Sequence, residues 1–152
     1  MGDLLRRRQR PPHHKKHRIR HGKTQDGRRA MFMFGNMAAG KGSFIGGIME
    51  VCGLKTVAIQ SVSRGRVPSR EFIIAANPQI VFVEYASESD KLYLEAFYKS
   101  DPVWSSTDAV KNDAVCFMPR NIVTIPSYRI METISLMRDF SRKQNKLLYC
   151  GQ

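Results

Sequence analysis

Short apolar runs with the composition of β-strands alternate with amphipathic helical stretches from residue 30 onward. The clearest run is QIVFVEY, residues 79–85, in which consecutive apolar side chains leave no polar face. Such a run is typical of a parallel strand that helices cover on both sides. Together with strand-like runs at residues 30–34, 56–59 and 114–119, it predicts a three-layer α/β/α domain with a mainly parallel sheet, a single Rossmann-like lobe.

Helices are expected in the stretches between these strands and after the last of them. Ser43 and Ser69 each stand where a helix N-cap is expected, because a serine hydroxyl can accept a hydrogen bond from a free backbone N–H. The predicted helices cover residues 43–52, 69–77, 90–99 and 127–143.

Positive charge is concentrated at the start of the chain. Residues 1–29 hold eleven Lys or Arg and two Asp, so they carry nine of the twelve net positive charges. This segment has almost no apolar residues and cannot bury enough surface to offset its ordering entropy. We expect residues 1–28 to form a basic disordered tail with no specific nucleic-acid partner, and no signal peptide is expected in it because no apolar stretch follows the charges.

The histidines and cysteines argue against catalysis and against a metal centre. All four histidines, at positions 13, 14, 17 and 21, lie in the basic segment, so the predicted domain has no imidazole for acid–base or nucleophilic work. Cys52, Cys116 and Cys150 show no metal-binding spacing. We therefore expect no catalytic residue, no metal ligand and no resident cofactor.

A glycine-rich stretch, FGNMAAGKGS at residues 34–43, follows the first predicted strand. Its glycines and Lys41 nearly match a phosphate-binding loop, in which backbone N–H groups cradle phosphates and a lysine reaches the outer ones. Gly42 stands where that loop usually has a Ser or Thr. A nucleotide-binding enzyme resembling a monophosphate kinase is therefore the alternative function, although no lid or second nucleotide site follows.

Ligands of parallel α/β sheets meet the loops at the carboxyl ends of the strands. In this chain those loops hold cations and one aromatic residue, which favours an anionic ligand. The candidate ligand-binding residues are Lys41, Arg64, Arg66, Tyr85 and Arg120.

The order of the segments resembles the C-terminal lobe of periplasmic binding proteins for ferric siderophores, haem and cobalamin, which feed ABC importers. The resemblance covers residues 29–142 and rests on three stretches: FIGGIMEVCGLKTVA from residue 44, NPQIVFV from residue 77, and DPVWSSTDAVKNDAVCFMP from residue 101. It implies that residues 29–152 form a C-terminal lobe that binds a solute without catalysis.

The family resemblance also implies a ligand, partners and a location. The ligand would be an iron complex or a related metal chelate, and the partners would be an ABC transporter permease and an N-terminal lobe. No sheet-forming segment precedes residue 29 in this sequence, so we expect a truncated lobe that offers half of a ligand cleft. The expected location is periplasmic, or extracellular at a membrane.

One residue is assigned to the permease by the resemblance. A glutamate on each lobe of the family docks against permease arginines, and IMEVCG places Glu50 at the matching position. If Glu50 has this role, it should be exposed, free of internal ion pairs, and on the rim that carries the ligand loops.

Overall fold

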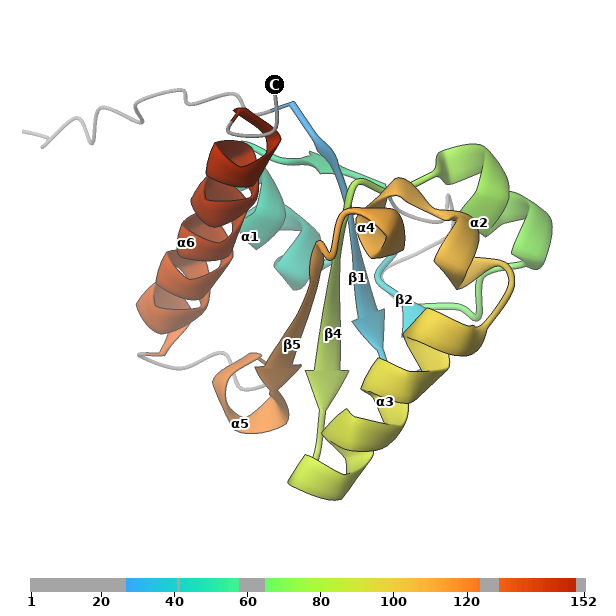
Figure 1. Ribbon diagram of the computed structural model, residues 1–152. Helices are drawn as coiled ribbons and strands as arrows, with labels where there is room; N and C mark the ends of the chain where they lie inside the picture. Colours follow the sequence, from blue (N-terminus) through green and yellow to red (C-terminus); the bar gives the residue numbers. More distant parts are fainter. Residues whose placement is uncertain (1–26, 41, 58–64, 124–128, 150–152) are drawn as a thin grey trace, which may run out of the picture.

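The computed structural model of the chain describes residues 27–40, 42–57, 65–123 and 129–149 (Figure 1). Residues 1–26 of the predicted tail at residues 1–28 lie outside the described residues. Gly27 and Arg28 already belong to the fold, because Gly27 N–H donates to Gly53 O and the buried Arg28 donates from Nη2 to Ser141 O. The packed part of the chain therefore begins before the expected boundary at residue 29.

A five-stranded sheet forms the centre of the molecule. Its strands are β1 (Arg29–Phe34), β2 (Met37–Ala38), β3 (Lys55–Thr56), β4 (Ile80–Tyr85) and β5 (Val115–Pro119). The order is β2-β1-β4-β5, with β3 also pairing β1. β1 pairs in parallel with β3 and β4, β4 pairs in parallel with β5, and β2 alone is antiparallel. The mainly parallel α/β lobe predicted from the sequence is confirmed.

Helices cover both faces of this sheet. They are α1 (Phe44–Val51), α2 (Arg70–Ala76), α3 (Glu88–Ser100), the 3-10 helix η1 (Trp104–Ser106), α4 (Asp108–Lys111), α5 (Arg120–Val123) and α6 (Ile130–Tyr149). Figure 1 shows α1 and α6 on one side of the strands and α2, α3 and α4 on the other.

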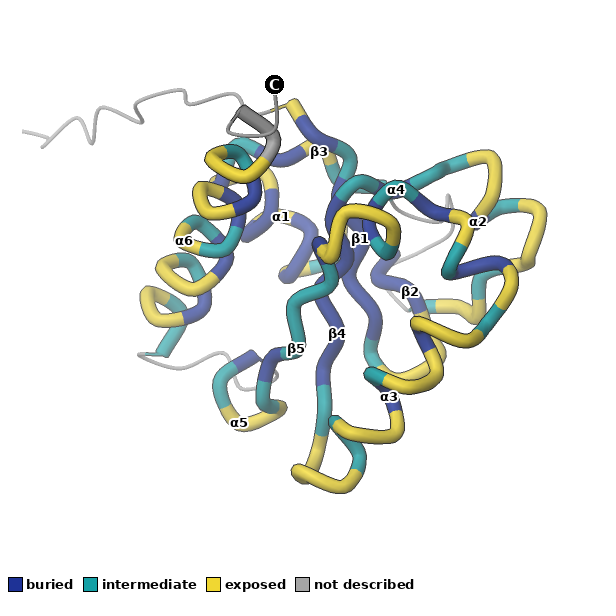
Figure 2. Tube along the Cα trace, viewed as in Figure 1, coloured by how far each residue is buried: buried dark blue, intermediate teal, exposed yellow. Residues whose placement is uncertain are grey.

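The central strands are apolar on both faces. Because successive side chains point to opposite faces, the core consists of two clusters. Ala30, Phe32 and Phe82 pack towards α1 and α6, whereas Met31 and Val83 belong to the cluster under α2, α3 and η1. All five are fully buried, as the dark blue strands in Figure 2 illustrate. Each Å² of apolar surface buried contributes about 25 cal/mol of stabilising free energy. A strand covered by helices on both faces gains this free energy on both of them.

Two of the predicted helix starts are confirmed by side-chain caps, whereas α3 begins at Glu88, two residues before its predicted start. Ser43 Oγ accepts from Gly46 N–H and Ser69 Oγ accepts from Phe72 N–H, so each serine satisfies one donor of the first turn. The end of α2 is set by Asn77, whose φ of 36° is left-handed, and Asn tolerates this conformation better than most residues. The Asn77 Oδ1 atom then accepts from Asp108 N–H and joins the end of α2 to α4.

Three features differ from the sequence prediction. Residues 37–38 form β2, which the sequence suggested was loop, because the Gly35 turn with a φ of 59° folds the chain back on β1. α5 was not predicted, because its single turn is too short to show periodicity. α6 begins at Ile130 and continues to Tyr149, six residues beyond its predicted end, since no Gly or Pro interrupts that stretch.

We predict that Phe82→Ala lowers the free energy of unfolding by about 3–5 kcal/mol, because it empties space in a core that can collapse only in part. Phe82 is fully buried and meets the ring of Phe140 edge-on, with centroids 6.1 Å apart. Urea denaturation followed by circular dichroism measures the loss. The control is Leu92→Ala on exposed α3 surface, which should change the free energy by less than about 0.5 kcal/mol. Equal effects of the two substitutions would contradict the placement of β4 at the centre.

Candidate ligand-binding site

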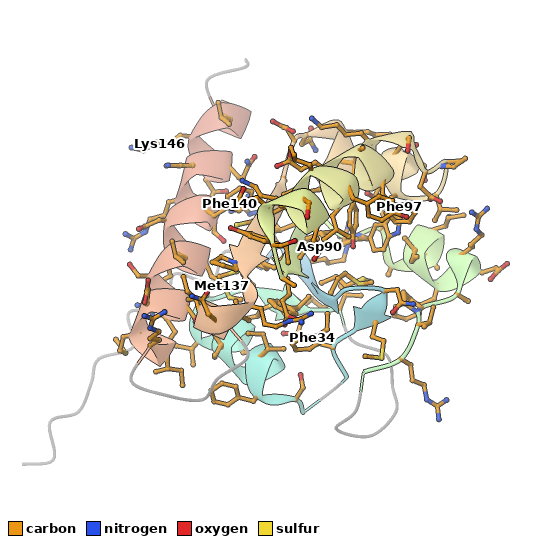
Figure 3. The ribbon with its side chains drawn as sticks, turned by 90° about the horizontal axis from the view of Figure 1, so that it is seen from below. Phe34, Asp90, Phe97, Met137, Phe140 and Lys146 are labelled. Atoms are coloured by element: carbon orange, nitrogen blue, oxygen red, sulfur yellow. The ribbon has the colours of Figure 1, made fainter. Side chains whose placement is uncertain are left out.

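Three parallel strands end at the same edge of the sheet. In the parallel registers Phe34 of β1 lies opposite Glu84 of β4, and Tyr85 lies opposite Pro119 of β5. The loops that follow these strands therefore meet along one edge, which Figure 3 views from below. This is the edge at which ligands of parallel α/β sheets bind.

An ion pair dominates this edge. Arg120 follows β5 directly, and its Nε donates to the Glu84 Oε1 atom at 2.5 Å. Only 4% of the Glu84 side chain is exposed, whereas 58% of the Arg120 side chain is. The hydrogen bond to Glu84 and its charge, with a smaller contribution from Asp90, raise the pKa of Arg120. The pair fixes a guanidinium group at the surface of the edge with a buried carboxylate behind it.

Glu84 was not among the predicted site residues. The sequence held a signal for it, because a lone acidic residue at the end of an apolar strand has to find a partner when it is buried. Arg120 alone could be selected from its position after a strand. Its partner became identifiable only when the β4–β5 register was known.

Tyr85 belongs to the other face of the sheet. Side chains alternate along a strand, so Tyr85 joins the α2–α3 core while Glu84 points towards α5 and α6. The Lys91 amine lies 5.8 Å from the centroid of the Tyr85 ring, within reach of a cation–π contact. The structure thus places Tyr85 and Arg120 at neighbouring strand ends but on opposite faces.

Arg66 is held beside β2 by backbone hydrogen bonds. Ala38 N–H donates to Arg66 O at 2.8 Å, and Arg66 N–H donates back to Ala38 O at 3.2 Å. A Cβ at Gly65 would lie 2.6 Å from Ala38 O, so only glycine allows this close approach. The Arg66 side chain is exposed. Lys41 and Arg64, the other predicted cations, lie outside the described residues.

The loop between β4 and α3 is closed by reciprocal capping. Ser87 Oγ accepts from Asp90 N–H, and Asp90 Oδ2 accepts from Ala86 N–H at 2.8 Å. The two bonds fix the loop that follows Tyr85. They also place a carboxylate near Arg120, so the described part of the edge is less positive than its arginines alone suggest.

The described part of the glycine-rich stretch does not have the geometry of a phosphate-binding loop. That motif leads from a strand directly into a helix whose free N–H groups face the phosphates. In this protein Met37–Ala38 pairs with β1 as an antiparallel strand before α1 begins. Ser43, the first capping residue of α1, already accepts from Gly46 N–H. The alternative of a nucleotide site therefore gains no support from the described part of this stretch.

Glu50 meets two of its three expected conditions. It is exposed, and it forms no ion pair with another described residue. The third condition is wrong, because α1 ends at the amino edge of the sheet: β3, which follows it, pairs Lys55 with Arg29 at the start of β1 (Figure 1). A helix that begins at the carboxyl edge of a strand and leads to a parallel neighbour must end at the opposite edge.

Both thiols that the structure describes are harder to ionise than a free cysteine. Burial raises the pKa of Cys116 to about 11 and also raises the pKa of Cys52. Within the described ranges, no group of three or more His, Cys, Asp or Glu residues could hold a metal ion. Their helices include none with the length and apolar composition that crossing a bilayer requires.

Comparison with solved structures reveals the same fold in solute-binding proteins. An ABC-type Fe3+-hydroxamate transport protein of Saccharomonospora viridis superimposes with a TM-score of 0.68 at 14% identity, over 79% of this chain and 43% of the other. The haem complex of Staphylococcus aureus IsdE gives 0.66 at 18% identity, over 79% and 49%. The vitamin B12 binding protein BtuF of Vibrio cholerae gives 0.65 at 16%, over 81% and 47%.

The chain thus spans about half the length of the solved structures it matches. A search of the curated proteins gave no match. Residues 13–122 match the family described as periplasmic binding protein, and the match begins within the basic segment. This match covers well over half of the sequence and agrees with the resemblance noted in residues 29–142. The chain belongs to the periplasmic binding protein family.

Proposed function

We propose that the chain is the solute-binding lobe of an ABC importer that takes up an iron complex, such as haem or a ferric siderophore, or a related metal chelate. The family match over residues 13–122 is the observation that carries this proposal. Support comes from solved proteins of the same fold: one complexed with haem, one that binds vitamin B12, and one of an Fe3+-hydroxamate transport system. The lobe would bind its solute without chemical change, at the periplasmic or extracellular side of a membrane.

The proposed contacts lie at the carboxyl edge of the sheet. Arg120 supplies a guanidinium group that Glu84 orients through Nε, so that the two terminal nitrogens can donate to a carboxylate or phenolate oxygen of a chelate. Orienting the side chain before binding lowers the entropy cost of the contact. Lys41, Arg64 and Arg66 would add positive charge, and Tyr85 would offer an aromatic surface.

The second wall of the cleft would come from another lobe. Small-molecule sites bury most of the surface of their ligand, and one flat edge of a sheet cannot do this. The chain covers less than half of each solved relative named above. An N-terminal lobe, on the same or a separate chain, and an importer permease are therefore the proposed partners.

We predict that the isolated chain binds haemin, ferric desferrioxamine B or cyanocobalamin weakly, and that one of them binds at least about tenfold more tightly once a second lobe closes the site. Isothermal titration would compare the full chain with a fusion to the N-terminal lobe of a solved relative. Titration of the relative's own complete protein is the control, because it shows how much of the affinity comes from the relative's N-terminal lobe. Magnesium ATP, the probe of the alternative function, should bind neither form.

Two results would count against the proposed function. One is that none of the three chelates binds the fusion. The other is micromolar binding of magnesium ATP to the full chain that is lost in Lys41→Ala.

We predict that Arg120→Ala weakens binding of the preferred anionic chelate to the fusion about tenfold, because a charge-assisted hydrogen bond is lost. Arg120→Lys should restore only part of the affinity, since an ammonium group cannot bond Glu84 through Nε and keep two planar donors for the ligand. Arg142→Ala, which removes an exposed arginine of α6, is the matched control and should leave affinity unchanged. An equal effect of Arg120→Ala and Arg142→Ala would show that only net charge matters.

The permease contact is proposed for Glu50. Glu50→Arg should reduce association of the fusion with its permease in liposomes, because it replaces attraction with repulsion, while chelate affinity stays the same. The comparison variant is Glu71→Arg, which reverses an exposed acid in the first turn of α2. Loss of association with Glu71→Arg but not with Glu50→Arg would move the contact to α2 and end the case for Glu50.

A further inference from the structure

A groove of about 530 Å³ runs beside α3, on the face of the sheet opposite α1 and α6. Met33 of β1 lines it from within the sheet, α3 forms one wall, and residues 67–73 at the start of α2 form the other. Its lining includes Asp90 near the start of α3 and Asp101 just after its end. The two residues are eleven positions apart along α3 and its C-cap, so at 1.5 Å per residue they span roughly 16 Å. This size suits a small molecule.

Four aromatic side chains line the groove in a continuous series from solvent to core. Tyr93 and Phe97 stack with ring centroids 6.5 Å apart and planes 16° from parallel. Phe97 then meets Tyr98 edge-on at 5.6 Å, and Tyr98 contacts Trp104 at 4.8 Å. Tyr98 and Trp104 are buried, but Tyr93 is 68% exposed and Phe97 37%. Two stacked aromatic rings left in solvent beside a cavity are a surface on which a flat ligand can stack.

The charges along the groove favour a cation. Asp101 is satisfied, because its Oδ1 accepts from Val103 and Trp104 N–H and its Oδ2 pairs with Arg70 at 3.3 Å. Asp90 accepts from Ala86 N–H and forms no ion pair with another described residue; Arg120, whose pKa the Asp90 charge helps to raise, lies outside the lining of the groove. The lining therefore has one carboxylate more than it has cations, at its Asp90 end (Asp90 and Phe97 are labelled in Figure 3).

We propose that this groove binds a flat aromatic molecule that carries a positive charge. Its ring stacks on Tyr93 and Phe97, and its charge lies near Asp90. Aromatic faces attract cations through the ring quadrupole, so stacking and charge favour the same class of ligand. The proposal concerns a site apart from the chelate contacts at Arg120, whose cationic residues favour anions.

The test is a fluorescence titration of the full chain with berberine, a planar aromatic cation. Trp104 is the single tryptophan of the chain and lines the groove, so quenching of its emission by berberine reports occupancy directly. We expect saturable quenching with one site per chain. Tyr93→Ala and Phe97→Ala should each weaken binding by up to about tenfold, the equivalent of one aromatic contact.

Matched variants separate a built site from adventitious dye binding. Leu92→Ala removes a neighbouring α3 side chain of similar exposure that does not line the groove, and it should leave the affinity within about twofold. Asp90→Asn keeps a capping side chain but removes the charge, so it should weaken berberine and leave the neutral dye Nile red unchanged. Urea midpoints of all variants check that they remain folded.

Three results would overturn the proposal. They are the absence of saturable quenching, equal effects of Tyr93→Ala and Leu92→Ala, and equal or tighter binding of the anionic dye 1-anilinonaphthalene-8-sulfonate. Failure of every chelate to bind the fusion would leave this titration unaffected, because the two experiments use different sites.

Discussion

The parallel pairing of β1, β4 and β5 is the constraint on which the rest of the structure depends. Apolar side chains project from both faces of β1 and β4, so helices have to cover both sides of the sheet. Polar side chains can then reach solvent only where the strands end. The acidic residue of β4, Glu84, is the second-last residue of the strand. It forms an ion pair with Arg120, which directly follows β5. The location of the candidate site is thus a consequence of the core.

Most of the fold could be predicted from the sequence, because strands buried on two faces leave continuous apolar runs and serine caps mark the starts of α1 and α2. What could not be predicted depends on contacts between distant residues. The bridge between Ala38 of β2 and Arg66 joins residues far apart in the sequence, and neither residue signals that pairing in its own neighbourhood. Single-turn elements such as α5 are too short for any periodicity to appear.

The candidate site was predictable in kind and less so in detail. Position after a strand was enough to select Arg120, Tyr85 and Arg66 for one edge, and the fold places them there or beside it. Which face each side chain occupies follows from register, and a shift of one residue would have exchanged Glu84 and Tyr85. Of the three conditions for Glu50, only its expected place on the ligand rim is wrong, and that place too depends on the topology of the sheet. α1 runs from the carboxyl edge of the sheet to its amino edge, so residues at its two ends lie on opposite sides of the molecule. The residue type alone does not indicate at which edge Glu50 lies.

The order of the strands has a consequence for folding during synthesis on the ribosome. β1 is made first but lies between β2 and β4, and its main partner begins fifty residues later in the sequence, as Ala30 opposite Ile80 shows. A ribosome must therefore extend well past β4 before β1 finds its neighbour, and the antiparallel turn onto β2 is the only sheet pairing of described residues that can form at once. Such non-local closure slows folding and leaves one edge of the apolar strand β1 unpaired during synthesis. Until β4 is made, the exposed edge of β1 is prone to aggregation, and in a lobe of this topology it has to be shielded by factors outside the chain.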